Sequence, residues 1–127
     1  MSILSGVTDF FGLDIGTTGI RLVQLHGMGN TKSLVKYAFT PIDSRIVLSN
    51  AESDQHNLKQ VISQLVSKAQ ITTKNVAVGL PSQRVFIVVA DMDRLPEDEL
   101  TKSIHYQIDG MIPTPPSEST IDWKLLG

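Results

Sequence analysis

The sequence predicts a mixed α/β fold. Three features predict it: short runs rich in branched apolar residues near the amino terminus, a long stretch with the period of an amphipathic helix, and further short apolar runs after that helix. Strands on both sides of a long helix are typical of a sheet in which the helix crosses over to a parallel neighbouring strand.

Three strands are expected first, over residues 12–16, 20–26 and 34–42. The connection between the first two, Gly16–Gly19, is four residues long, which suits a hairpin. A turn is predicted over residues 27–31, where glycines and an asparagine cluster. These elements together predict a three-stranded antiparallel meander.

A helix is expected to follow the meander. Apolar residues recur every three to four positions across residues 58–69, which predicts one apolar helix face. Residues 43–53 are predicted as a polar loop before this helix. Ser53 or Asp54 is predicted to cap the first turn of the helix, because short polar side chains accept hydrogen bonds from free amides there.

The rest of the chain is predicted to alternate strands and a helix. The apolar run 75–80 is expected to form a strand parallel to an earlier one, and residues 84–90 to form another strand. A helix is expected over residues 96–111, since proline suits a first turn and the carboxylates at 97–99 favour the positive end of the helix dipole. Alternating apolar residues predict a last strand over 121–125.

Composition narrows the function. The 127 residues carry a net charge of -2 and no run of lysines and arginines, so nucleic acid is not an expected partner. The absence of cysteine excludes disulfides and thiolate metal sites. The apolar stretch Val85–Ala90 is far shorter than the ~20 residues that span a bilayer, and Met1–Thr8 does not have the pattern of a signal peptide. We therefore expect no direct membrane insertion.

One segment, Gly12–Val23, carries residues suited to phosphate chemistry. Asp14 lies near the end of a predicted buried strand, where a carboxylate is costly unless it is paired or faces a ligand. Gly16, Thr17, Thr18 and Gly19 follow, and such a turn offers amides and hydroxyls to an anion, with glycine free to adopt positive φ. Arg21 adds positive charge. Asp14 is then the expected ligand of a hydrated Mg²⁺ ion. The alternative is an ordinary turn in which Asp14 bonds nearby amides.

Other polar residues favour structural roles. His26, His56 and His105 are far apart and have no partners at metal-ligand spacing. The acidic residues between Asp91 and Glu99 are expected to solvate and cap a helix. Ser82 has no base at motif spacing, so a nucleophilic role is not expected.

The segment from Asp14 to Leu25 resembles the first phosphate motif of the actin, heat-shock chaperone and sugar-kinase superfamily. In actin-like members a basic residue commonly follows the aspartate by seven positions, and Arg21 occupies that place. Nearly the whole chain resembles the PilM family of type IV pilus assembly proteins, which is similar to the division protein FtsA. The segments that match in order are Phe11–Leu25, Leu65–Ala69, Lys74–Pro81, Leu95–Leu100 and Ile112–Pro113, with a strand containing Asp122 after them.

This resemblance implies an actin-like fold and an ATP and Mg²⁺ site. It places residues 1–90 in the first half of an actin-like lobe and residues 91–127 at the beginning of an FtsA-like small subdomain. The second phosphate loop and the adenine contacts of the family have no counterpart here. We therefore expect this chain to be the amino-terminal part of a longer protein, to bind ATP weakly or not at all by itself, and to have little or no ATPase activity.

The resemblance also implies partners and a location. In the family, the cytoplasmic tail of the membrane protein PilN binds near the segments that correspond to Asn75–Arg84 and Pro96–Met111. We expect a cytoplasmic scaffold that a PilN-like protein holds at the inner membrane, where other pilus components are further expected partners. Exposed strand edges would allow a homodimer. The alternatives are an FtsA-like division protein and a fragment of a sugar or acetate kinase.

Overall fold

The structure, a computed structural model, describes residues 9–27 and 31–126. The prediction for Met1–Thr8 and the middle of the turn predicted over 27–31 lie outside the described residues. The chain divides into two compact units, the first ending at Val85 and the second beginning at Phe86. Each unit is described by itself below.

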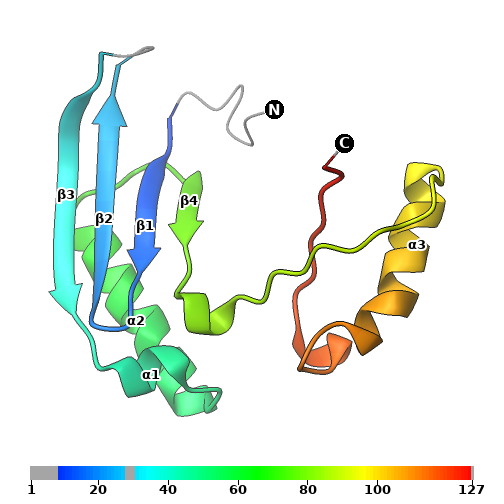
Figure 1. The fold of residues 1–127 in the computed structure, drawn as a ribbon. Coiled ribbons are helices and arrows are strands. Elements are labelled where there is room, and N and C mark those ends of the chain that lie inside the picture. Colours follow the sequence, from blue (N-terminus) through cyan, green and yellow to red (C-terminus); the bar gives the residue numbers. More distant parts are fainter. Residues whose placement is uncertain (1–8, 28–30, 127) are drawn as a thin grey trace. The chain divides into compact units, whose positions relative to one another are not determined.

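The first unit contains a four-stranded sheet in the order β3-β2-β1-β4 (Figure 1). Its strands are β1 (Phe11–Ile15), β2 (Gly19–His26), β3 (Ser33–Pro41) and β4 (Val76–Gly79). Strands β1, β2 and β3 pair antiparallel, whereas β4 pairs parallel to β1. Both the meander and the parallel crossover predicted from the sequence are therefore confirmed.

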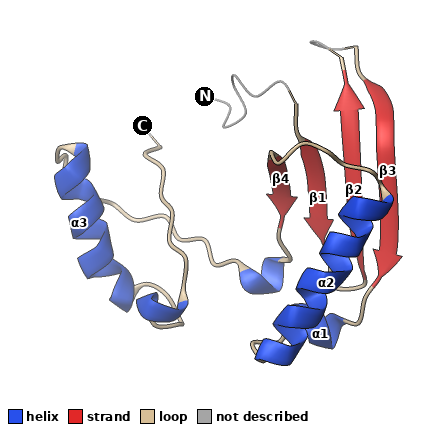
Figure 2. Cartoon of the chain, turned by 180° about the vertical axis from the view of Figure 1, so that it is seen from behind, coloured by secondary structure: helices blue, strands red, loops and turns tan. Residues whose placement is uncertain are grey.

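Two helices connect β3 to β4. The predicted amphipathic helix is α2 (Glu52–Lys68), and Figure 2 shows it lying across one face of the sheet. The polar loop predicted over residues 43–53 is wrong, because it contains the short helix α1 (Ser44–Leu48). Asp43 caps α1 by accepting a hydrogen bond from the Arg45 amide, and the helix buries Val47.

The predicted caps of α2 are also wrong. The helix begins at Glu52, so Ser53 and Asp54 lie inside its first turn, and its N-cap residue, Ala51, makes no side-chain capping bond. The Ser49 hydroxyl accepts a hydrogen bond from the Ala51 amide just before the helix. Acidic residues in the first turn, Glu52 and Asp54, favour the helix start through its dipole instead.

The core lies between α2 and the sheet. Its buried members come from alternate positions of the two central strands and from the helix: Phe11, Leu13, Ile20, Leu22 and Leu65. Because strand side chains alternate between faces, the intervening residues point to the opposite face of the sheet. That face carries exposed Tyr37 and Phe39.

The second unit contains α3 (Glu97–Gln107), which buries Leu100 and has three carboxylates in its first turn. The helix predicted over 96–111 ends earlier, at Gln107, and continues as the 3-10 turn Ile108–Gly110. A further 3-10 turn spans Pro116–Glu118. None of the described helices has the length and apolar character needed to cross a membrane.

Two predicted strands are wrong. Residues 84–90 follow or end the 3-10 turn Ser82–Arg84 and form no strand, and residues 121–125 form none either. Their alternating or branched apolar residues favour an extended backbone, but a strand also requires a hydrogen-bonded neighbour. Neither segment has such a neighbour among the described residues, and Ile87 is 84% exposed.

Candidate phosphate-binding site

The candidate site lies where β1 and β4 end. These strands are parallel, and Asp14 pairs in register with Gly79 near their carboxyl ends. Ligands of open α/β sheets commonly bind beyond the carboxyl ends of parallel strands. Asp14 is therefore in a place where its carboxylate can meet a ligand, and the turn that follows β1 lies at the same end of the sheet (Figure 1).

That turn, Gly16–Gly19, joins β1 to β2. The Gly16 amide donates to the Gly19 carbonyl at 3.1 Å, which closes the hairpin, and the Ile42 amide donates to the Thr18 carbonyl at 3.4 Å. Thr17 is half-buried and Thr18 exposed. Neither glycine adopts left-handed φ, so the backbone freedom expected of Gly16 is not used. Glycine is needed there for space: a Cβ on Gly16 would lie 3.0 Å from the Gly19 carbonyl oxygen.

Arg21 is brought to Asp14 by the pairing of β1 with β2. The two residues are in register, and Arg21 Nη1 lies 3.5 Å from Asp14 Oδ2. The same nitrogen lies 3.5 Å from the Gly19 carbonyl oxygen. The Arg21 and Asp14 side chains are 54% and 59% exposed. The expectation that the strand is buried at Asp14 is therefore wrong. An exposed pair of this kind contributes only about 0–1 kcal/mol, and it leaves both groups accessible to a ligand.

The residues at this corner fit a hydrated magnesium ion. Magnesium commonly binds one or two carboxylates and keeps several waters, and Asp14 supplies one exposed carboxylate. No group of three or more metal-binding side chains occurs among residues 9–27 and 31–126. Space around the carboxylate is kept open by glycine: a Cβ on Gly79 would lie 3.3 Å from Asp14 Oδ1.

Two residues of this corner were missed in the sequence. Gly79 lies beside Asp14 across the parallel pair, and Phe39 of β3 places its ring 5.1 Å from the Arg21 guanidinium carbon. The pattern of β3 indicated that Phe39 is in a strand, but only the register with β2 shows that it faces Arg21. The predicted crossover offered a signal for Gly79, since a parallel strand must end beside Asp14.

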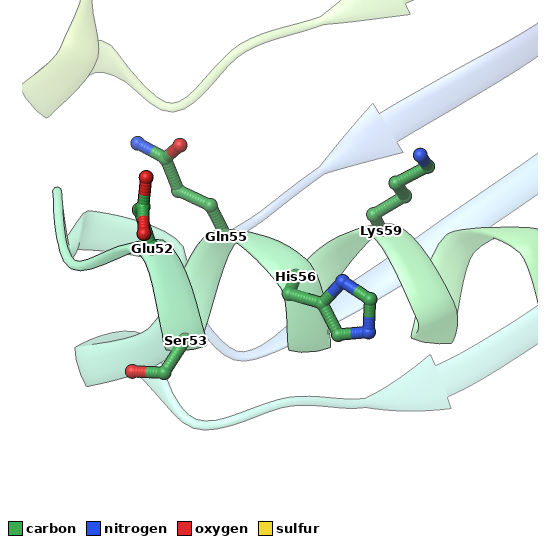
Figure 3. Close-up of a pocket in the computed structure, with 5 residues that line it drawn as sticks. All are labelled: Glu52, Ser53, Gln55, His56 and Lys59. Atoms are coloured by element: carbon green, nitrogen blue, oxygen red, sulfur yellow. The ribbon is translucent and has the colours of Figure 1, made fainter.

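Two surface depressions lie elsewhere in the first unit. One is open and runs along the first turns of α2, and Figure 3 shows that its side chains point in different directions rather than toward a common centre. It includes His56 and Glu52, which belong to no group of three or more metal-binding side chains within the described part of the chain. The other is an apolar groove beside the candidate site, lined by Ile15, Val47, Ser49, Gln55, Leu58, Leu80, Pro81 and Arg84.

The sequence of the chain matches a known protein family. A sequence model of the type IV pilus assembly protein PilM matches residues 12–127. The chain belongs to the PilM family. Among solved structures, the PilM-PilN type IV pilus biogenesis complex is similar at 22% identity and a TM-score of 0.63. The match covers 87% of this chain and 36% of that one, so the chain spans about a third of the PilM structure.

Weaker likenesses extend beyond the PilM family. A Ppx/GppA enzyme from Aquifex aeolicus matches at 13% identity and a TM-score of 0.42, over 56% of this chain and 25% of that one. Another structure of the Aquifex aeolicus family member matches at 14% identity and a TM-score of 0.39, with similar coverage. The likeness to PilM confirms the actin-like α/β fold predicted from the sequence.

Proposed function

We propose that this chain supplies the first phosphate-binding segment of an ATP site in a PilM-type scaffold of type IV pilus assembly. The observation that supports it best is the meeting of Asp14 and Arg21 beside the turn Gly16–Gly19 at the carboxyl ends of β1 and β4. The turn residues Gly16, Thr17, Thr18 and Gly19 would donate to phosphate oxygens. Arg21 would neutralise phosphate charge, and Asp14 would hold hydrated Mg²⁺.

The corner is suited to binding rather than to hydrolysis. Binding needs donors and complementary charge, which Arg21 and the turn supply. Turnover also needs a positioned water and a group that accepts its proton. Asp14, the carboxylate of this corner, is assigned to the metal in this proposal, so it is not the group that would accept that proton. We therefore assign the segment to nucleotide binding with little or no ATPase activity.

A nuclear magnetic resonance (NMR) titration of the 127-residue chain with Mg·ATP tests this site. We expect saturable shifts of the amide signals of Gly16–Gly19, with a dissociation constant of about 1–10 mM because one wall of a nucleotide cleft leaves most of the ligand in water. Replacing Arg21 with Gln should weaken binding severalfold, whereas the same replacement of Arg94, an exposed arginine of the second unit, should not. Shifts that avoid the turn, or an unchanged dissociation constant in R21Q, would overturn the proposal.

We further propose that a PilN-like membrane protein is the partner that holds the scaffold at the cytoplasmic side of the inner membrane, next to other pilus components. The support is membership of the PilM family and the likeness to a PilM structure solved together with PilN. The expected contact segments include Asn75–Arg84, and this stretch supplies Leu80, Pro81 and Arg84 to the lining of the apolar groove. An extended peptide docks such a surface through apolar pockets and backbone bonds.

Capture of the chain by an immobilised PilN-like tail peptide tests the partner. Leu80 and Leu34 are matched surface leucines, 59% and 56% exposed, but only Leu80 lines the groove. We expect Leu80→Asp to abolish capture and Leu34→Asp to leave it unchanged. A scrambled peptide that captures the chain equally well would contradict the assignment.

The kinase alternative has its own test. Phosphotransfer from ATP to a small sugar would favour it.

Self-association is a separate proposal. Strands β3 and β4 form the two edges of the sheet, and an edge strand presents unpaired backbone groups to a second chain. Copies of the chain would then pair through one of these edges as a homodimer. Sedimentation equilibrium over a range of concentrations tests this, and a monomer at every concentration would refute it.

A further inference from the structure

We propose that Phe39 is a positioning residue for Arg21: its ring holds the guanidinium group at the Asp14 corner, ready to receive phosphate. This inference rests on the proposed function of the corner. It is carried by the contacts that Phe39 makes with Arg21 on one side and with the backbone of Gly19 on the other.

The pairing of β2 with β3 sets the first contact. Arg21 and Phe39 are cross-strand partners, so both side chains lie on the face of the sheet opposite α2. The guanidinium carbon of Arg21 is 5.1 Å from the centre of the Phe39 ring, within the range of a cation–π contact. A planar guanidinium stacks on an aromatic face in a way that still leaves its N–H groups free to donate.

The second contact fixes the ring itself. A Cβ built on Gly19 would lie 2.4 Å from Phe39 Cε2 and 3.0 Å from Cζ, so the ring rests directly on the bare backbone of Gly19. Gly19 pairs with Pro41, and Phe39 is the diagonal neighbour that an aromatic side chain reaches. The ring therefore joins the end of the phosphate turn to the side chain of Arg21.

Arg21 needs such a support because its other contacts are weak. Its side chain is 54% exposed, and its distances to Asp14 and to the Gly19 carbonyl are both 3.5 Å. A long side chain that is free in solution loses conformational entropy when it grips a ligand, and a side chain that is already held loses less. Phe39 would thus improve phosphate binding without touching the phosphate.

The test compares Phe39→Leu with Tyr37→Leu in the whole 127-residue chain. Tyr37 lies on the same strand and the same face but pairs with Val23, so its removal is a matched loss of exposed aromatic surface. The first readout needs no nucleotide: the side-chain NMR signals of Arg21 should be displaced by the ring current of Phe39. We expect F39L to return them to ordinary positions and Y37L to leave them displaced.

The second readout is the dissociation constant for Mg·ATP. We expect F39L to weaken binding about two- to fivefold, the size expected for loss of one exposed cation–π contact, and Y37L to have no effect. Phe39→Trp should retain the affinity. Equal losses in F39L and Y37L, or unchanged Arg21 signals in F39L, would overturn the inference. If the wild-type chain shows no binding at the turn, the proposed function fails, while the Arg21 signals still report whether Phe39 holds the side chain.

Discussion

The ring of Phe39 covers Gly19 so closely that no other residue type fits at position 19 without displacing it. The Cβ of an alanine there would also lie 3.2 Å from the Thr40 carbonyl oxygen, part of the backbone of β3. Gly19 is therefore required by the neighbouring strand rather than by a left-handed turn. The hairpin turn, β3 and the side chain of Arg21 are linked through this single contact.

Gly19→Ala should push the Phe39 ring away from the sheet and release Arg21. The ring is the movable partner, so we expect a loss of about 1–2 kcal/mol in the free energy of unfolding, together with loss of the ring-current displacement of the Arg21 signals. Urea unfolding and NMR measure the two effects. Gly110→Ala is the control, because a Cβ there meets nothing within 4 Å. An unchanged Arg21 spectrum in G19A would contradict the structure at this contact.

Gly79→Ala should disturb the Asp14 carboxylate, the proposed magnesium ligand, more than the fold. The new Cβ would lie 3.3 Å from Asp14 Oδ1, and the exposed carboxylate can turn away at a cost to stability of under about 0.5 kcal/mol. We expect the gain in ATP affinity that Mg²⁺ provides to fall, while metal-free ATP binding stays the same. Gly12→Ala in β1 is the control, since its Cβ would make an ordinary 3.5 Å contact with Val23. Equal Mg²⁺ dependence in both variants would argue against Asp14 as the metal ligand.

Arg84→Ala should loosen the segment that follows β4. Arg84 donates to the Ser49 carbonyl and to Asn50 Oδ1 at 2.6 Å each, and to the Val47 carbonyl at 3.2 Å, which satisfies carbonyls at the end of α1. We expect the free energy of unfolding, measured with urea, to fall by about 1–2 kcal/mol. Arg84→Lys should recover little of it, because an ammonium group lacks the planar fork that reaches several acceptors. Full recovery in R84K would show that charge alone is enough.

Asp43 provides a prediction about pH. The Arg45 side chain and then the Arg45 amide donate to its carboxylate, which lowers the pKa of Asp43 from 3.8 to about 2. A lowered pKa in the folded chain means that the capping interaction stabilises α1 above pH 3.8 and is lost as the pH falls through about 2. The carboxyl carbon signal of Asp43 should report that midpoint. Arg45→Ala should move it back toward 3.8, and Lys59→Ala should not.

Local and periodic signals predicted most of the first unit. The branched runs, the four-residue turn and the helical stripe identified β1, β2, β3, α2 and the parallel β4, because each is specified by residues close together in the sequence. The helix α1 was not predicted, because a helix of five residues is too short to show a periodic apolar pattern. The signals that the sequence did offer were Asp43, a residue type that commonly caps helices, and the apolar residue Val47.

The candidate site could be predicted only in part. Asp14, Arg21 and the turn are close in sequence, so the predicted hairpin was enough to bring them together. Phe39 and Gly79 join them through strand register, which depends on how distant segments pair and cannot be read from composition. The errors at residues 84–90 and 121–125 have the same origin, since an apolar pattern specifies extended backbone but not a pairing partner.

The two strand pairings that flank Asp14 differ in how much chain must be closed to form them. The pairing of β1 with β2 needs only a short hairpin, which forms in about 1–10 microseconds. The pairing of β1 with β4 must close a much longer loop, because β3, α1 and α2 lie between these strands in the sequence. Closing so long a loop costs more entropy and takes more time. A newly made chain would therefore bring Arg21 to Asp14 before Gly79 reaches Asp14, so the proposed nucleotide site would be complete only after β4 had paired with β1.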